Sequence, residues 1–203
     1  DDETSCVGVL GVNPDENRTF IAMAAHFRAQ GIAVPEVYAV SEDAVAYIQE
    51  DLGDTALFGI VGSEGSEELL CRTVRCLPDI QFKGADGFDF SVCHSVCRFD
   101  RRLVLFDLNY FKYCFLKPSG LEFDENRLQD DFERLADDLT SVKTDTFMYR
   151  DFNARNVMIK DGAPCFIDFQ GGMQGPIYYD VASFVWHARA GYSEELKMKM
   201  LEA

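Results

Sequence analysis

The sequence has few basic side chains and no long apolar run. Lysine and arginine together number 19, against 35 aspartates and glutamates, which gives a formal net charge of −16 at pH 7. Because a protein that binds nucleic-acid backbones needs a basic surface, we expect no nucleic-acid partner. Anionic membrane surfaces are disfavoured for the same reason. No apolar run approaches the roughly 18 residues that span a bilayer, so we expect no membrane partner either.

The sequence also lacks an even set of cysteines and a secretory leader. Its seven cysteines stand in apolar surroundings such as Tyr113-Cys114-Phe115, which is typical of reduced core thiols. The first residues, Asp1-Asp2-Glu3, are unlike the basic and then apolar start of a signal peptide. We therefore expect a cytoplasmic protein. The oligomeric state stays open.

Apolar residues are abundant enough to form a core, since they make up 47% of the 203 residues. In the first fifty residues, runs that favour strands alternate with one amphipathic helix. We predict strands over residues 6–12, 37–40 and 44–49, and a helix that starts around Pro14 and ends at Gly31. This part is therefore expected to be rich in β-structure.

Beyond Gly53 the sequence becomes mainly helical. The aromatic-rich residues 101–116 predict a buried helix, with most of their aromatic side chains in the core. The change in periodicity predicts an α+β fold. A small β-rich part is expected at residues 1–52, and a mainly helical, truncated part at residues 53–203.

A β-hairpin is predicted near the middle of the helical part. Two β-prone runs, at residues 156–159 and 163–167, flank the dipeptide Asp161-Gly162. This dipeptide between such runs is a strong signal for a two-residue turn of type I′. In that register Asn156 pairs with Ile167, and directly paired side chains lie roughly 5 Å apart.

Three polar side chains are expected at the open end of this hairpin. Asn156 and Asp168 stand at its strand ends, and Asp151 precedes Asn156 by a short loop. An amide oxygen and a carboxylate are hard ligands that suit Mg²⁺, and a separate carboxylate can take the proton of an attacking hydroxyl group. The spacing predicts Asn156 and Asp168 as metal ligands and Asp151 as a catalytic base. The alternative is a hairpin whose polar ends are only solvated.

The same segment resembles the catalytic centre of the aminoglycoside phosphotransferase and choline kinase family. Residues 149–156 (Tyr-Arg-Asp-Phe-Asn-Ala-Arg-Asn) are similar to its His-x-Asp-x-x-x-x-Asn loop, and residues 166–169 (Phe-Ile-Asp-Phe) to its metal-binding strand end. Residues 179–183 (Tyr-Asp-Val-Ala-Ser) resemble the start of a helix that supports this loop. Residues 31–37 resemble a segment of the family's small lobe, and residues 49–54 its inter-lobe hinge.

The resemblance implies a protein-kinase-like fold of two lobes, with a partial small lobe and a catalytic hairpin in the large one. It also implies phosphoryl transfer from ATP, or another nucleoside triphosphate, with Mg²⁺ as cofactor. The hinge would bind the nucleotide through the backbone of Glu50 and Leu52. Asp180 would support the catalytic loop, and we expect Arg150 to support it through backbone carbonyl groups rather than to touch phosphate.

The acceptor implied by the resemblance is a small molecule. The wording Arg-Asp-Phe-x-x-Arg-Asn at residues 150–156 and Ile-Asp-Phe-Gln at residues 167–170 is most similar to bacterial anomeric kinases of amino sugars. Those enzymes act on N-acetylmuramate and N-acetylglucosamine. The likeness implies phosphorylation of a sugar hydroxyl group, at C1.

Two departures from the family pattern keep other functions open. Tyr149 replaces the usual histidine, and the strand at residues 6–12 has no lysine where a kinase pairs the nucleotide phosphates. These departures favour a nucleotide-binding pseudokinase or regulatory module, whereas the intact polar triad favours an enzyme. Choline or an aminoglycoside remains an alternative acceptor.

Overall fold

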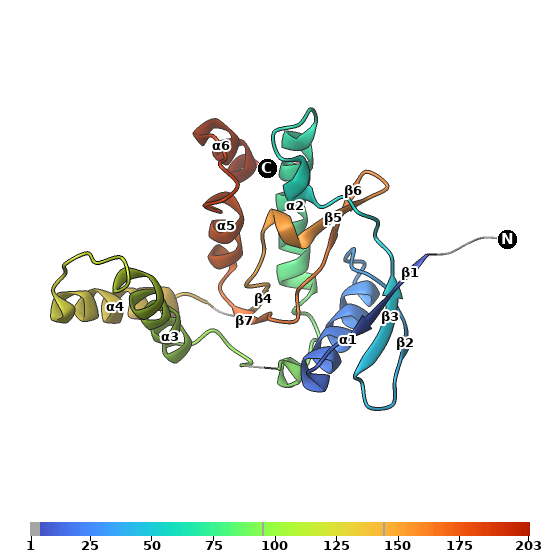
Figure 1. Cartoon of the computed structure of the whole chain (residues 1–203), viewed down its shortest axis with the longest axis horizontal. Coiled ribbons are helices and arrows are strands. Elements are labelled where there is room, and N and C mark those ends of the chain that lie inside the picture. The colour runs from blue at the N-terminus through green and yellow to red at the C-terminus, as the bar shows by residue number, and fades with distance from the viewer. Residues whose placement is uncertain (1–4, 95, 144) are drawn as a thin grey trace.

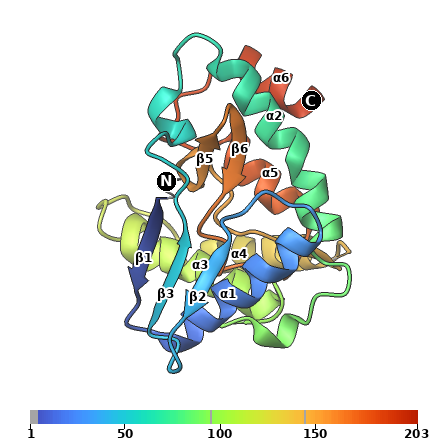
Figure 2. The same ribbon diagram turned by 90° about the vertical axis from the view of Figure 1, so that its right-hand side faces the viewer.

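A computed structural model of the chain describes residues 5–94, 96–143 and 145–203. Residues 1–4 of the predicted β-rich part lie outside the described residues. In this part, β1 (Cys6–Leu10), β2 (Val37–Val40) and β3 (Ala46–Glu50) form an antiparallel sheet in the order β1-β3-β2. Helix α1 (Pro14–Ala29) crosses one face of this sheet (Figure 2). The predicted strand, helix, strand, strand order is confirmed.

Helix α1 begins where its sequence provides a cap. The side chain of Asn13 accepts hydrogen bonds from the backbone N–H groups of Asp15 and Glu16, and Pro14 opens the first turn. The helix turns Phe20 toward the sheet, where its ring stacks on Tyr47 with 5.3 Å between centroids. The first turn of α1 carries the acidic residues Asp15 and Glu16. This turn lies near the loop that follows β6, since Glu16 accepts a hydrogen bond from Gln170 of that loop.

The middle of the chain is helical, as predicted. A short 3₁₀ turn (Leu57–Ile60) leads to α2 (Ser66–Pro78), which continues as a π-helical turn (Asp79–Lys83), and another 3₁₀ turn follows at Phe90–Val92. Helix α3 (Arg101–Phe111) runs on into a π-helical turn, η4 (Lys112–Leu116), and α4 (Glu125–Thr140) lies beside it. Figure 1 places α3 and α4 at the end of the molecule opposite the three-stranded sheet.

The prediction of a buried helix over residues 101–116 is wrong. Its aromatic side chains are largely exposed, from 44% for Phe111 to 65% for Tyr110. The helix packs only along a narrow stripe that includes the buried Val104. Hydrophobic content predicted burial here, but the neighbouring helix α4 covers only one side of α3. The exposed cysteine at position 114 likewise departs from the expected core thiols.

Two small two-stranded sheets contain the strands around the predicted catalytic residues. Strands β4 (Thr146–Met148) and β7 (Met173–Gly175) pair with each other, as do β5 (Val157–Lys160) and β6 (Ala163–Phe166). A 3₁₀ turn (Ala154–Asn156) leads into β5, and helices α5 (Ile177–Val185) and α6 (Glu194–Glu202) follow. The segment between β4 and β7 therefore starts and ends at neighbouring strands.

One hydrophobic cluster joins the β-rich part to the helical part. It extends from Phe20 in α1 to Met200 in α6. The ring of Phe20 stacks on Phe169 at 4.9 Å, and Phe27 meets Phe147 edge to face at 4.9 Å. The division into domains at residues 1–52 and 53–203 stays a prediction. Within the described residues, no helix is both long and apolar enough to cross a membrane.

Candidate active site

The predicted hairpin and its register are confirmed. Lys160 pairs with Ala163, and Asp161 and Gly162 both have positive φ angles, of 51° and 73°, as a type I′ turn requires. The backbone N–H of Ile167 donates to the carbonyl oxygen of Asn156 at 3.1 Å, so pairing extends one step beyond the strands. Asn156 and the residue after Ile167 therefore lie at the same end of the hairpin.

The hairpin is held in place by the chain around the predicted hinge. The N–H of Ile159 donates to the carbonyl oxygen of Thr55 at 2.8 Å, and the N–H of Phe166 donates to that of Ala33 at 2.8 Å. Each strand of the hairpin is thus bonded to a segment next to the three-stranded sheet. This arrangement fixes the hairpin's polar end relative to α1.

Asp151 lies in a loop that is held by hydrogen bonds from two asparagines. The side-chain amides of Asn153 and Asn156 each donate to the carbonyl oxygen of Asp151 at 2.9 Å. This leaves the Asp151 carboxylate exposed, beside Gly171, where a Cβ atom would come within 3.9 Å of its Oδ2. The hydrogen bond from Asn153 was not predicted, although an asparagine two residues after the aspartate is a usual turn-forming signal.

Asp168 stands in a strained conformation at the other strand end. Its φ angle is 64°, which is uncommon for a residue other than glycine and recurs at functional sites. Partial burial raises the pKa of Asp168, and the negative charges of Asp151 and Glu16 raise it further, whereas hydrogen bonds from Gln170 and Asn156 lower it. The charges of Asp151 and Glu16 and the amide of Asn156 thus all act on Asp168.

The donor set at this end of the hairpin fits Mg²⁺. The ion is usually held by one or two carboxylates with phosphates and water completing its shell, and Asp168 with the amide oxygen of Asn156 can supply the protein's share. A divalent cation would offset the mutual repulsion of the acidic groups. Among the described residues no group of three or more His, Cys, Asp or Glu side chains could hold a metal ion by itself.

Gln170 and Glu16 link α1 to this end of the hairpin. The side-chain amide of Gln170 donates to Oδ1 of Asp168 at 3.0 Å and to Oε1 of Glu16 at 3.4 Å. Glu16 lies in the first turn of α1. A neutral amide therefore bridges the helix acid and the strand-end acid. Because the two are far apart in sequence, their proximity was not predictable from spacing.

Asp180 lies beneath the catalytic loop, as expected. Its carboxylate is fully buried and accepts the backbone N–H groups of Tyr149 and Arg150, at 2.9 Å each. The side-chain amide of Gln81 also donates to it, at 3.4 Å. Burial raises the pKa of Asp180 to about 6, although these hydrogen bonds act in the opposite direction.

Tyr149 anchors the start of the loop to the hairpin. Its ring is buried and its hydroxyl group donates to the carbonyl oxygen of Ile167. Burial raises the pKa of Tyr149 well above its ordinary value, and the nearby charges of Asp168 and Asp180 add to the effect. The tyrosine that replaces the expected histidine is therefore a neutral structural hydrogen-bond donor.

Arg150 supports the loop in a different way from the one expected. Its guanidinium group donates to Oδ1 and Oδ2 of Asp107 on α3, at 3.0 and 3.4 Å, rather than to backbone carbonyl groups. Its φ angle is 74°. Charge attraction to a carboxylate outcompetes neutral carbonyl acceptors for a guanidinium group. Asp107 was not singled out from the sequence, because an acid within a helix gives no local signal.

The predicted hinge has its side chains committed to structure. Glu50 is the last residue of β3, and its side chain accepts a hydrogen bond from the ammonium group of Lys160 in β5. Its Oε2 lies 3.6 Å from a guanidinium nitrogen of Arg28. Although desolvation acts to raise it, the pKa of Glu50 is held below its usual value by the hydrogen bond from Lys160. Leu52 is buried, and no backbone hydrogen bond among the described residues uses its N–H or carbonyl group. Its role in nucleotide binding stays a prediction.

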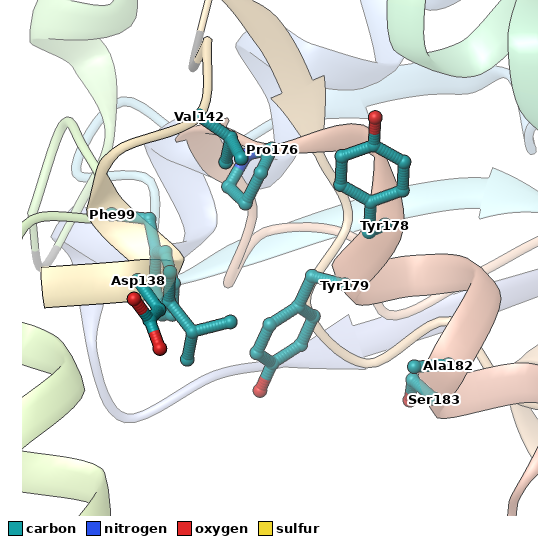
Figure 3. A pocket seen from close by; sticks show the side chains of 9 residues that line it. Phe99, Asp138, Val142, Pro176, Tyr178, Tyr179, Ala182 and Ser183 are labelled. Carbon is teal, nitrogen blue, oxygen red and sulfur yellow. The ribbon is translucent and has the colours of Figure 1, made fainter. Parts of the chain in front are cut away.

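A separate apolar hollow of about 450 Å³ lies between α4 and α5 (Figure 3). Phe99 and Asp138 stand on one side of it and the rings of Tyr178 and Tyr179 on the other. Among the described residues, its lining includes none of the predicted site residues. The candidate active site is therefore an open polar end of a hairpin rather than this apolar hollow.

Comparison with known proteins identifies the family to which these features belong. Residues 10–203 match the model of the phosphotransferase enzyme family. The chain is 28% identical over 178 residues to the N-acetylmuramate/N-acetylglucosamine kinase of Neisseria meningitidis serogroup B, covering 84% of this chain and 51% of that protein. It is 25% identical to the enzyme of the same name from Pseudomonas aeruginosa, covering 89% and 53%. The chain thus spans about half the length of these relatives.

Solved structures show the same fold. The choline kinase LicA from Streptococcus pneumoniae superposes with a TM-score of 0.64 at 10% identity, over 100% of this chain and 68% of that one. The gentamicin complex of APH(2″)-IIa superposes with a TM-score of 0.64 at 14% identity, over 99% and 70%. The expected α+β, protein-kinase-like fold is therefore confirmed. With the family model matched from residue 10 to the last residue, the chain belongs to the phosphotransferase enzyme family.

Proposed function

We propose that this protein transfers the γ-phosphoryl group of ATP to a hydroxyl group of a small molecule, an amino sugar. The observation that carries the proposal is the convergence of Asp151, Asn156 and Asp168 at one end of the hairpin. A base and two hard metal ligands are the parts that kinase-type phosphoryl transfer needs. Family membership supports the reaction class, and the two curated relatives support the acceptor class.

In the proposed reaction each of these residues has a separate task. Asp151 accepts the proton of the acceptor hydroxyl group, since its carboxylate is exposed while its carbonyl oxygen is fixed. Asn156 and Asp168 hold Mg²⁺, which when bound offsets negative charge on the β- and γ-phosphates. Asp180 keeps the loop amides of residues 149 and 150 in place. No covalent enzyme intermediate is needed, because positioning and charge supply most of the rate.

Nucleotide binding is assigned to the hinge at Glu50–Leu52. The side chain of Glu50 is occupied by Lys160 and Arg28, whereas no backbone hydrogen bond among the described residues uses the N–H or carbonyl group of Leu52. Backbone groups at the junction between the sheet and the catalytic hairpin are suited to the edge of a purine base. Proteins of the same fold carry AMP, ADP or GDP in their solved complexes.

A non-catalytic nucleotide-binding role is the second candidate. It is favoured by the absence of a lysine from β1 and by the contact of Glu16 with the neutral amide of Gln170. Such a module would bind nucleotide through the same hinge and metal ligands. Turnover distinguishes the two roles.

The test is Mg²⁺-dependent ADP release by the full-length protein on a panel of acceptors. The panel contains N-acetylglucosamine, N-acetylmuramate, choline and an aminoglycoside. We expect turnover with an amino sugar and loss of at least about 10²-fold in kcat for Asp151→Asn, because loss of a general base costs on the order of 10²–10⁴. ATP affinity should stay near that of the wild type.

The matched control is Asp161→Asn, which removes an exposed acid at the far end of the same hairpin. Wild-type turnover by Asp151→Asn would remove Asp151 from the mechanism. If the wild type binds ATP but turns over no acceptor, the non-catalytic nucleotide-binding role is correct and the enzymatic role is wrong.

A further inference from the structure

One carboxylate of helix α3 binds the loop that carries Asp151. Asp107 lies in the middle of α3 and bonds through both oxygens to one nitrogen of Arg150, at 3.0 and 3.4 Å. Only 34% of the Asp107 side chain and 26% of the Arg150 side chain are exposed. The pair is therefore better shielded than the exposed ion pair between Arg101 of the same helix and Asp137 of α4. Shielding strengthens an ion pair and raises the cost of losing one partner.

Arg150 needs this partner because its backbone is strained. A φ angle of 74° is unfavourable for a side chain of this size, and such a conformation persists only where the surroundings hold it. The N–H of Arg150 is fixed by Asp180 at 2.9 Å, and its guanidinium group is fixed by Asp107. The next residue along the chain is Asp151, whose direction depends on this turn.

Without Asp107 the next carboxylate along the chain from Arg150 is that of Asp151. Arg150 is bonded to Asp107 and is adjacent in sequence to Asp151, so the three charged groups form one cluster. An unpaired guanidinium group in this cluster would turn to Asp151. A base that is paired with a guanidinium group is held away from the acceptor hydroxyl group and accepts its proton less readily.

We propose that Asp107 is a positioning residue that keeps Arg150 away from Asp151 and holds the strained turn that presents Asp151 to the acceptor. Asp107 acts through Arg150 and touches neither substrate. The inference rests on the proposed function of Asp151. It makes α3, which is remote in sequence from the loop, part of the catalytic architecture.

The test is a double-mutant cycle in the full-length protein. Asp107→Ala should lower kcat by about 10- to 100-fold, because small displacements of a catalytic group cost up to that much, while the KM values for ATP and acceptor change by less than about threefold. Asp107→Asn, which keeps an acceptor oxygen, should lose less. Adding Arg150→Ala to Asp107→Ala should cause no further loss, since the released guanidinium group is then absent.

The matched control is Asp137→Asn, which removes one of the two ion pairs that Arg101 of α3 makes with α4 and does not touch the loop. It should leave kcat unchanged. Losses from Asp107→Ala and Arg150→Ala that multiply in the double variant would overturn the proposal. So would a change in the acceptor KM with an unchanged kcat, which would make Asp107 an acceptor contact.

A second readout does not depend on turnover. The N–H groups of Tyr149 and Arg150 donate to Asp180, so their hydrogen exchange reports the state of the turn. Asp107→Ala should speed this exchange at least about tenfold, and Asp137→Asn should not. If the wild type is inert on every acceptor, the proposed function fails, and unchanged exchange in Asp107→Ala would separately refute the positioning role.

Discussion

At the scale of single residues, the site combines one buried acid with exposed ones. Asp180 is fully buried and accepts hydrogen bonds from the loop above it and from Gln81. Asp151 and Asp168 keep their carboxylates open to solvent. A buried carboxylate that accepts two backbone N–H groups fixes a loop, whereas an exposed carboxylate can meet a ligand. Burial therefore separates the support of the loop from its chemistry.

The raised pKa of Asp180 predicts a pH-dependent contribution to stability. Because its pKa is about 6 in the folded protein against an ordinary 3.8, the native state binds more protons than the unfolded state between these values. Its contribution is then greatest at low pH and is lost as the pH rises through 6. Relative to Asp180→Asn, the wild type should be about 1 kcal/mol more stable at about pH 5 than at about pH 7.5.

Urea unfolding of both proteins at the two pH values measures this difference. The same comparison with Asp161→Asn, an exposed turn residue, supplies the baseline. A difference that stays constant, or that grows toward pH 7.5, would contradict the assigned environment of Asp180.

Asp168 should matter for the metal complex rather than for the nucleotide alone. Asp168→Asn removes a charge from the predicted Mg²⁺ ligand, so affinity for Mg²⁺–ATP should fall by at least about tenfold, as a lost charge-assisted contact is worth about 1.5–3 kcal/mol. Affinity for ATP in the presence of EDTA should be unchanged. Calorimetric titration under both conditions measures the effect, and an equal loss in both would remove Asp168 from the metal site.

At the scale of elements, the hairpin was predictable and the helix partners were not. The Asp161-Gly162 turn sets its own φ angles and thereby the register that joins Asn156 to Asp168. Such local chemistry can be read directly from a sequence. The partner of Arg150, by contrast, comes from α3, and the partner of Gln170 comes from α1. Contacts between elements that are distant along the chain leave no local pattern.

The exposed aromatic face of α3 and η4 illustrates the same limit. Periodicity places apolar residues on a helix, but burial depends on what packs against it. The narrow contact with α4 leaves Phe106, Tyr110 and Phe115 more than 60% exposed. Composition alone therefore predicted the helix correctly and its surroundings wrongly.

A glycine immediately before β7 should be essential to the packing of these elements. A Cβ atom at Gly172 would lie 2.2 Å from the ring of Phe147 and 2.9 Å from the carbonyl oxygen of Phe169. Gly172→Ala should therefore lower the free energy of unfolding by about 1–3 kcal/mol through overpacking. At the neighbouring Gly171 a Cβ atom meets only Asp151, at 3.9 Å, so Gly171→Ala is the matched control. Equal urea midpoints for the two variants would contradict this packing.

At the scale of the whole molecule, the catalytic hairpin connects the sheet to the helices. Its strands are bonded to Thr55 and Ala33, while Phe169, next to Asp168, stacks on Phe20 of α1. Movement of α1 relative to the hairpin would therefore displace Asp168, the predicted metal ligand. The relatives support the proposed acceptor class, and this geometry supports the proposed roles of the site residues.

The central claim is that Asp151 takes the proton of a sugar hydroxyl group during phosphoryl transfer. It is tested most directly by ³¹P NMR of the product that forms from ATP, Mg²⁺ and N-acetylglucosamine with the full-length protein. We predict a sugar 1-phosphate signal with the wild type and a rate of formation at least about 10²-fold lower with Asp151→Asn. Formation of the same product at the wild-type rate by Asp151→Asn would contradict the claim.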